Sequence, residues 1–276
     1  MINRLQTRLS ALRVAKRCGL APYVTAGDGG METTLAVLRG LERASVACVE
    51  LGIPFSDPIA DGPVLQAAAE RAISAGASFD RVLDLLARFR REPPIGETPI
   101  VLMGYANPLL RRGWDASCRA LAEAGADGVL VADLPIEEGA PLAAAAESAG
   151  IAAIFFASPT TGDERLAAAA RMSRGFLYAI GRLGVTGARV EIDPAQGAFL
   201  DRVRAAAGDL PIAVGFGLST ADQVRAVAGH ADLAIVGSAM VDRIHRAFTA
   251  AGGESSAAAR AAEDFARELT KGLETS

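Results

Sequence analysis

The chain has 276 residues, of which 51% are hydrophobic, and its formal net charge is −4 with a pI near 5.4. This acidic balance argues against nucleic-acid binding, and no run of about 18 uncharged apolar residues suggests a membrane span. Residues 1–17 are polar and have no apolar signal region, and an odd number of widely spaced cysteines argues against a disulfide framework. We therefore expect a cytoplasmic protein in a reducing compartment.

The predicted elements alternate regularly between short apolar strands and amphipathic helices. After an N-terminal helix, we expect strands at 20–26, 47–52, 99–103, 128–132, 151–156, 175–180, 211–215 and 232–236. The helices between and after them are expected at 33–44, 64–75, 79–90, 115–124, 137–149, 163–172, 195–207, 221–228 and from 238 onward, with a terminal helix closing the chain. Residues 104–108 are expected to be a strand exit without helix, and the glycine-rich residues 181–187 to begin a mobile lid.

Eight strands that alternate with helices at a spacing of about 25–35 residues predict an α/β fold, a single (β/α)8 TIM barrel over residues 1–276. An open doubly wound sheet is the competing architecture. It usually has fewer strands and a glycine fingerprint after the first strand, which Gly27-Asp28-Gly29-Gly30 does not match.

Composition restricts the chemistry of such a barrel. The two lysines, Lys16 and Lys271, lie in the terminal segments, so no strand offers a Schiff-base lysine. The two histidines, His230 and His245, are expected away from the active face, and no cysteine–histidine cluster has zinc spacing. We therefore expect no metal, and Asp, Glu and Tyr remain for proton transfer.

The second strand ends in a carboxylate, Glu50, where its apolar pattern predicts another hydrophobic residue. A proline-rich loop with two further acids, Asp57 and Asp61, follows it. A buried carboxylate without a partner costs several kcal/mol, so it needs a reason. A salt bridge or a helix cap is the plain alternative, but a second acid in the constrained loop favours acid–base chemistry.

Phosphate commonly binds after the seventh and eighth strands of a TIM barrel. Gly215-Phe216-Gly217 follows the seventh strand and Gly237-Ser238 the eighth, while Gly184-Val185-Thr186-Gly187 follows the sixth. Glycines and helix N-termini suit an anion, and three such loops on one face predict a phosphate site. The alternative is that these are only helix starts capped by Ser219 and Ser238.

Between the acids and the phosphate loops, the strand ends carry residues that suit an aromatic ring: Tyr23, Met103, Leu130, Phe156, Tyr178 and Phe216. For each of them, and most of all for Leu130 and Met103, barrel core is the alternative. The pattern predicts a substrate with a phosphate at one end and an aromatic group at the other.

The segment from Glu50 to Pro63, Glu-Leu-Gly-Ile-Pro-Phe-Ser-Asp-Pro-Ile-Ala-Asp-Gly-Pro, resembles the signature of the tryptophan synthase α subunit family. Further motifs match in the same order: Met103 to Pro108, Asp133-Leu134-Pro135, Gly184 to Gly187, Gly215 to Gly217 and Gly237 to Ala239. The resemblance implies a lyase of tryptophan biosynthesis that cleaves indole-3-glycerol phosphate to indole and glyceraldehyde 3-phosphate by a retro-aldol reaction, without a metal or organic cofactor.

The resemblance also implies the parts that individual residues play. Glu50 corresponds to a proton shuttle, Asp61 to the acceptor of the indole N–H, and Tyr178 to a residue beside them. The other matches are an indole pocket of Tyr23, Met103, Leu130, Ala132, Phe156 and Thr186; a phosphate site of Gly184, Gly215, Phe216, Gly237 and Ser238; and a contact through Asp57, Asn107 and Pro135 with a β subunit, in an α2β2 heterotetramer. Two positions depart from the family pattern: Gly29 stands where proline is usual, and Gly181 where serine is usual.

Three alternatives stay open at this point. A stand-alone lyase would release free indole for a specialised pathway. An inactive scaffold that activates a β-type partner would be expected to lack Glu50 or Asp61, and both are present. A phosphoribosyl isomerase would share the phosphate loops but typically lacks the acidic proline-rich loop.

Overall fold

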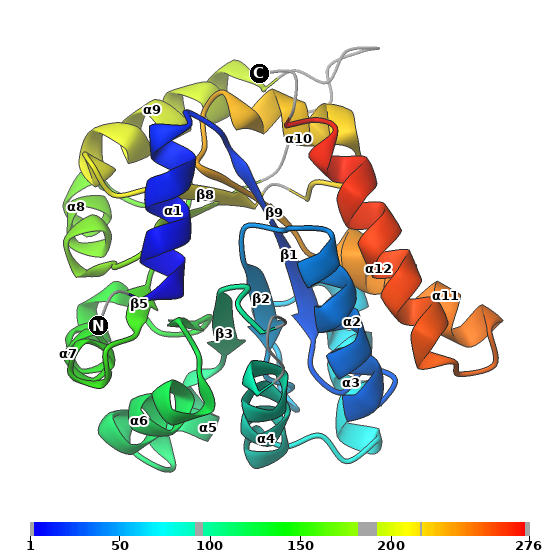
Figure 1. Cartoon of the computed structure of the whole chain (residues 1–276). Coiled ribbons are helices and arrows are strands. Elements are labelled where there is room, and N and C mark those ends of the chain that lie inside the picture. Colours follow the sequence, from blue (N-terminus) through cyan, green and yellow to red (C-terminus); the bar gives the residue numbers. More distant parts are fainter. Residues whose placement is uncertain (1–2, 92–95, 182–191, 216, 274–276) are drawn as a thin grey trace.

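The computed structural model describes residues 3–91, 96–181, 192–215 and 217–273. In this part of the chain, nine parallel strands form one sheet in the order β5-β4-β3-β2-β1-β9-β8-β7-β6 (Figure 1). The strands are β1 Gly19–Thr25, β2 Val49–Gly52, β3 Ile100–Gly104, β4 Gly128–Val131, β5 Ala152–Ile154, β6 Phe156–Ala157, β7 Leu177–Ile180, β8 Ile212–Gly215 and β9 Leu233–Val236.

The sheet closes into a barrel through the fifth predicted strand. The single strand expected at 151–156 is wrong in one respect, because β5 and β6 are separate strands on either side of Phe155. β5 pairs with β4, whereas β6 pairs with β7, and the N–H of Tyr178 donates to the carbonyl of Phe155 at 3.0 Å. The two strands at opposite ends of the sheet order are thus joined by one residue, which brings those ends together and confirms the TIM barrel.

Helices surround the strands on the outside (Figure 1). They are α1 Arg4–Val14, α2 Met31–Arg43, α3 Pro63–Ser74, α4 Phe79–Arg90, α5 Ala106–Leu110, α6 Trp114–Ala124, the 3-10 helix η1 Ile136–Glu138, α7 Ala140–Ala149, α8 Asp163–Met172, α9 Pro194–Ala207, α10 Ala221–Ala228, α11 Ser238–Ala250 and α12 Ser255–Thr270. The predicted helices match these closely, and Ser78 caps α4 as expected.

Two further stretches differ from the sequence prediction, and each contains a proline. Residues 104–108 were expected to be a loop, but α5 begins at Ala106 with Pro108 in its first turn, where a missing N–H costs nothing. The helix expected at 137–149 is divided into η1 and α7, because Pro141 cannot donate the N–H that would continue a helix from residue 137.

The core has two layers. Side chains that point outward from the strands pack against the helices, while a second cluster fills the barrel interior, with Val101, Leu130 and Leu233 fully or almost fully buried. Leu5 and Leu9 of α1 belong to this inner cluster, so α1 closes the end of the barrel at which the strands begin.

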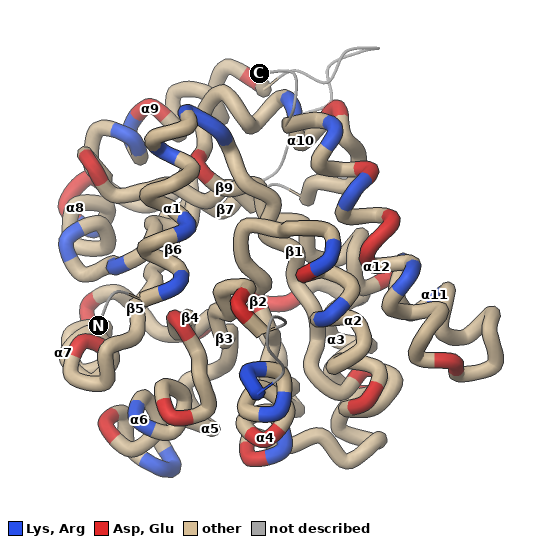
Figure 2. Tube along the Cα trace, viewed as in Figure 1, with Lys and Arg blue, Asp and Glu red and all other residues tan. Residues whose placement is uncertain are grey.

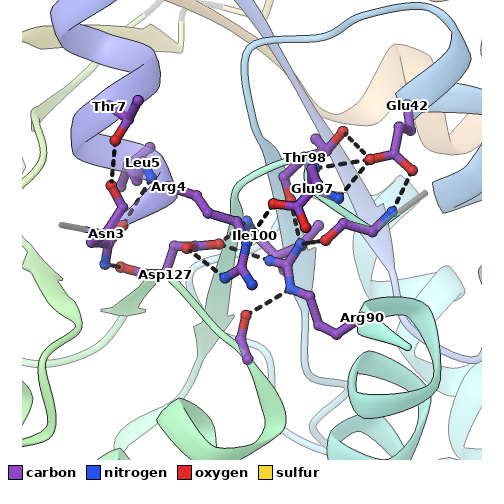
Figure 3. A network of polar contacts seen from close by, with 12 residues as sticks. Asn3, Arg4, Leu5, Thr7, Glu42, Arg90, Glu97, Thr98, Ile100 and Asp127 are labelled. Atoms are coloured by element: carbon purple, nitrogen blue, oxygen red, sulfur yellow. Dashed lines mark hydrogen bonds and ion pairs between the residues drawn. The ribbon is translucent and has the colours of Figure 1, made fainter. Parts of the chain in front are cut away.

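The same end is held by a buried polar network around Asp127, which is 2% exposed (Figure 3). Its carboxylate accepts hydrogen bonds from the guanidinium of Arg90 at 2.7 Å and the N–H of Ile100 at 2.9 Å, with Arg4 at 3.4 Å. The side chain of Asn3 donates to the carbonyl of Asp127 at 2.6 Å. α1 and α4 are thereby fastened to the starts of β3 and β4.

Charged residues gather on the helices and loops (Figure 2). In the nine strands, which contain only described residues, Glu50 is the one charged residue. Among the described residues, no helix is both long and apolar enough to cross a membrane. The charge that the sequence places at the end of the second strand is therefore unusual within this fold.

Candidate active site

A cavity of about 640 Å³ lies at the end of the barrel where the strands terminate. Residues from loops and strands on both sides of the barrel line it. Of the predicted site residues, those on its wall are Tyr23, Glu50, Asp61, Met103, Ala132, Pro135, Phe156, Tyr178, Gly215, Gly237 and Ser238. The three groups expected for acid–base chemistry, ring binding and phosphate binding thus share one cavity.

Glu50 enters this cavity from β2, where it is paired with Tyr23 of β1 and Val101 of β3. Its side chain is 5% exposed, and Oε1 has no hydrogen-bond partner within the described part of the chain. Burial, reinforced by the nearby charge of Asp61, raises the pKa of Glu50 to about 8. Near neutral pH the carboxyl group is therefore predominantly protonated, which makes it a proton donor.

Asp61 reaches the cavity from the loop between β2 and α3. The backbone N–H of Asp61 donates to the carbonyl of Pro58 at 3.0 Å, and Oδ2 accepts a hydrogen bond from the hydroxyl of Tyr105 at 3.0 Å. Burial raises the pKa of Asp61, and the hydrogen bond from Tyr105 opposes that shift because it stabilises the ionised form. The two carboxyl groups thus have different surroundings and suit different parts of a proton-transfer reaction.

Aromatic rings frame the cavity beside Glu50. The rings of Phe156 and Tyr178 are 5.0 Å apart and tilted by 37°, and Tyr23 and Tyr178 are 6% and 9% exposed. The pKa of each of these tyrosines is raised, first by burial and further by neighbouring carboxylates, so both hydroxyls stay protonated. A flat apolar ring fits such a wall.

A further part of the cavity wall, at the ends of β8 and β9, is built from Gly215, Gly217, Gly237 and Ser238. Ser238 is the first residue of α11, and the N-cap residue of this helix is Gly237, so no side chain caps the helix. The alternative in which Ser238 is merely the cap of this helix is therefore wrong. The N-terminus of this 13-residue helix faces the cavity with backbone N–H groups that favour an anion. The other capping alternative is also wrong, because α10 is capped by Thr220 and not by Ser219.

The remaining predicted residues lie elsewhere. Leu130 is a correction: it does not line the cavity but is fully buried in the inner cluster, because it lies within β4, below the strand end. Gly184, Thr186 and Phe216 are outside the described residues. Asp57 and Asn107 are exposed, as is Pro135 on the cavity wall.

The structure also shows residues whose part the sequence reasoning missed. Tyr105 was noticed only within a motif, although it holds Asp61, and its position directly after a barrel strand was a usable signal. Arg165 lines the cavity and pairs with Glu137 at 2.7 Å, with nothing in the sequence pattern pointing to it.

At the departure noted at Gly29, the backbone has φ of +78°, which a proline cannot adopt.

Comparison with known proteins gives one consistent family. The family model for the tryptophan synthase alpha chain matches residues 9–273. The chain is 46% identical to the tryptophan synthase alpha chain of Caulobacter vibrioides over 249 residues, which cover 89% of this chain and 88% of that one. It is 47% identical to that of Alkalilimnicola ehrlichii over 246 residues, which cover 88% of each chain.

Solved structures agree with these relatives. The tryptophan synthase subunit alpha of Legionella pneumophila has a TM-score of 0.88 at 34% identity and covers 100% of both chains. A chain of the tryptophan synthase α2β2 complex of Pyrococcus furiosus has a TM-score of 0.80 at 35% identity, covering 92% of this chain and 97% of that one.

Proposed function

The chain belongs to the tryptophan synthase alpha chain family, whose lyase reaction is the cleavage of indole-3-glycerol phosphate, and we propose that Glu50 and Asp61 carry out that reaction here. The observation that carries the proposal is the state of Glu50. It is a buried carboxyl group with a pKa of about 8, has an unpartnered oxygen, and lies in the same cavity as a second carboxylate.

In the proposed first step, protonated Glu50 gives its proton to C3 of the indole ring, and the ring becomes an indolenine with positive charge at its nitrogen. Asp61 accepts the hydrogen bond of the indole N–H and stabilises that charge. The Glu50 carboxylate then removes the proton of the side-chain hydroxyl adjacent to the ring. As that hydroxyl becomes a carbonyl, the carbon–carbon bond breaks and its electrons return to the ring, giving indole and glyceraldehyde 3-phosphate with no net proton change.

The rest of the cavity supports the binding of this substrate. We assign the phosphate to the backbone around Gly215 and Gly237 and to Ser238 at the start of α11, with Gly184 and Phe216 completing that site as further expectations. We assign the indole ring to Tyr23, Met103, Ala132, Phe156 and Tyr178. Thr186, which lies outside the described residues, is a further expectation for the same pocket. The described residues of both groups line the same cavity as Glu50, which supports the proposal that the bond to be broken lies beside that carboxyl group.

We further propose a β subunit as the partner, in an α2β2 assembly, with contacts through Asp57, Asn107 and Pro135. The solved α2β2 complex of Pyrococcus furiosus supports this, as does the exposure of these residues together with Ile59, an apolar side chain that is 81% exposed in the acidic loop. The compartment we infer is the cytoplasm, which suits the three unpaired cysteines Cys18, Cys48 and Cys118.

The test is the release of indole from indole-3-glycerol phosphate by the purified chain, alone and with a tryptophan synthase β subunit. We expect slow release that rises strongly with the β subunit and falls about 10²–10⁴-fold in Glu50→Gln. The matched control is Glu147→Gln, the same change at an exposed position of α7. Fast release that ignores the β subunit would favour the stand-alone lyase, and no release under either condition would refute the assignment.

A further inference from the structure

Tyr105 stands at the junction between a barrel strand and the acidic loop. It directly follows β3 and is the N-cap residue of α5. The next residue, Ala106, donates its N–H to Asp133 at 2.7 Å, which fixes the backbone of this junction to the loop after β4. Tyr105 is 3% exposed, so its ring has little freedom.

The hydrogen bonds of the Tyr105 hydroxyl have only one consistent direction. The backbone N–H of Ala60 lies 3.1 Å from the hydroxyl oxygen, and an amide N–H can only donate. The hydroxyl therefore accepts from Ala60, and its own proton is directed to Asp61 Oδ2 at 3.0 Å. A carboxylate held through one oxygen keeps its second oxygen as an acceptor for a ligand.

The ring of Tyr105 holds the other end of the same loop. It stacks on Phe55, with ring centroids 5.1 Å apart and planes 28° from parallel. The loop is therefore attached to Tyr105 near its start, through Phe55, and near its end, through Ala60 and Asp61. An aromatic stack stabilises the fold by more than the burial of its apolar area alone. A hydrogen bond to a charged group stabilises it by more than a hydrogen bond between neutral groups.

We propose that Tyr105 is a positioning residue that holds Asp61 ready to accept the indole N–H, an inference that rests on the function proposed above. Tyr105 does not touch the reacting atoms in this proposal; it acts through Asp61. Three other titratable groups interact electrostatically with Asp61: Glu50 of β2, Tyr23 of β1 and Tyr178 of β7. The two tyrosines stay protonated and neutral, so of these three groups only Glu50 can add a charge to that of Asp61, and it is mostly ionised only above its pKa of about 8.

The first test uses no substrate and therefore does not depend on the proposed reaction. The titration of the Asp61 carboxyl carbon is followed by NMR in the full chain labelled at aspartate, with Asp61→Asn to identify the signal. We expect Tyr105→Phe to raise the pH at which Asp61 titrates, because a hydrogen bond to its ionised form is lost while the ring and its stack remain. Tyr178→Phe is the matched control, a cavity tyrosine without a hydrogen bond to Asp61, and should shift this titration less.

The second test is kinetic. Tyr105→Phe should lower kcat/KM for indole-3-glycerol phosphate about 10- to 100-fold, the range for losing one hydrogen bond to a charged group. Because Tyr105 acts through Asp61, the double variant with Asp61→Asn should be no slower than Asp61→Asn alone. An Asp61 titration that Tyr105→Phe leaves in place, or a double variant whose loss equals the product of the two single losses, would overturn the proposal.

Discussion

A methyl group on Gly52 would lie 2.0 Å from the hydroxyl oxygen of Tyr23, so these residues of two adjacent strands fit together only because position 52 has no side chain. The Tyr23 ring is held on its other sides by Ala68 of α3 and Val241 of α11. The tyrosine beside Glu50 therefore has its place in the cavity wall set by a glycine two positions further along β2.

We expect Gly52→Ala to force the Tyr23 ring into the cavity and to lower kcat/KM more than tenfold. Overpacking of this kind should also reduce the free energy of unfolding by about 1–3 kcal/mol. Steady-state kinetics and urea unfolding measure the two effects. Gly197→Ala in α9 is the control: an added methyl group there meets nothing within 4 Å, so activity should stay and stability should rise by up to about 1 kcal/mol.

Combining Gly52→Ala with Tyr23→Phe should recover part of the lost stability, because the shortest contact involves the hydroxyl oxygen. The measurement is the urea midpoint of the double variant against that of Gly52→Ala alone. A double variant less stable than both single variants would contradict this account of the contact.

Glu50 should make the stability of the protein depend on pH. Its pKa in the folded chain is about 8 against 4.5 as the ordinary value, so between these pH values the folded state binds more protons than the unfolded state. Stability from this group is then complete below pH 4.5, declines as pH rises and is lost above about 8. Since one pKa unit corresponds to about 1.4 kcal/mol, the loss is on the order of several kcal/mol.

Glu50→Gln should remove that decline, because the amide never ionises. We expect the variant to be more stable than the original chain at pH 9 and to show a flatter stability curve between pH 5 and 9, measured by urea unfolding at each pH. Glu147→Gln should leave the slope unchanged. Parallel curves for the original chain and Glu50→Gln would show that burial does not raise the pKa of Glu50.

Asp61→Asn should lower the pKa of Glu50, because the charge of Asp61 is one of the two causes that raise it. The change should be partial, since burial is the larger cause and remains. Carboxyl-carbon NMR of Glu50 in the free protein gives the value without any need for activity. A Glu50 titration at an unchanged or higher pH in Asp61→Asn would contradict the coupling.

The buried pair of Arg90 and Asp127 should dominate stability at the opposite end of the barrel. Their side chains are 8% and 2% exposed, so Arg90→Met leaves a buried carboxylate without its main partner and should cost about 3–5 kcal/mol. The comparison is Arg246→Met, which breaks an exposed pair with Asp242 and should cost less than about 1 kcal/mol. Urea unfolding measures both, and equal losses would rule out this explanation.

Much of the fold follows from patterns that are local in the chain. Apolar runs of four to seven residues separated by amphipathic helices predict the strands of a barrel, and helix α8 has the bounds expected for it. The division of the fifth strand at Phe155 did not follow from these patterns. A continuous apolar run contains no sign of where its hydrogen-bonding partner changes from β4 to β7, because that depends on where the ends of the sheet meet.

The candidate site divides in the same way. Residue types alone pointed to Glu50 and to the loop acids Asp57 and Asp61, because a carboxylate in an apolar strand and acids in a proline-rich loop are visible without coordinates. The resemblance to the family singled out Asp61 among the loop acids. The sequence could not show that Leu130 lies beneath the cavity, since position along a strand decides depth only once the strands are aligned.

The alternation of strands and helices along the chain and the chemical character of the site could thus be predicted from the sequence by itself, through periodicity and through charges where apolar residues are expected. The tertiary structure alone decided that Tyr105 holds Asp61, that Gly52 makes room for Tyr23 and that Glu50 remains protonated near neutral pH. The physical reason is that hydrogen bonds, close packing and pKa shifts depend on distances between residues far apart in the chain, which are set only when the barrel closes.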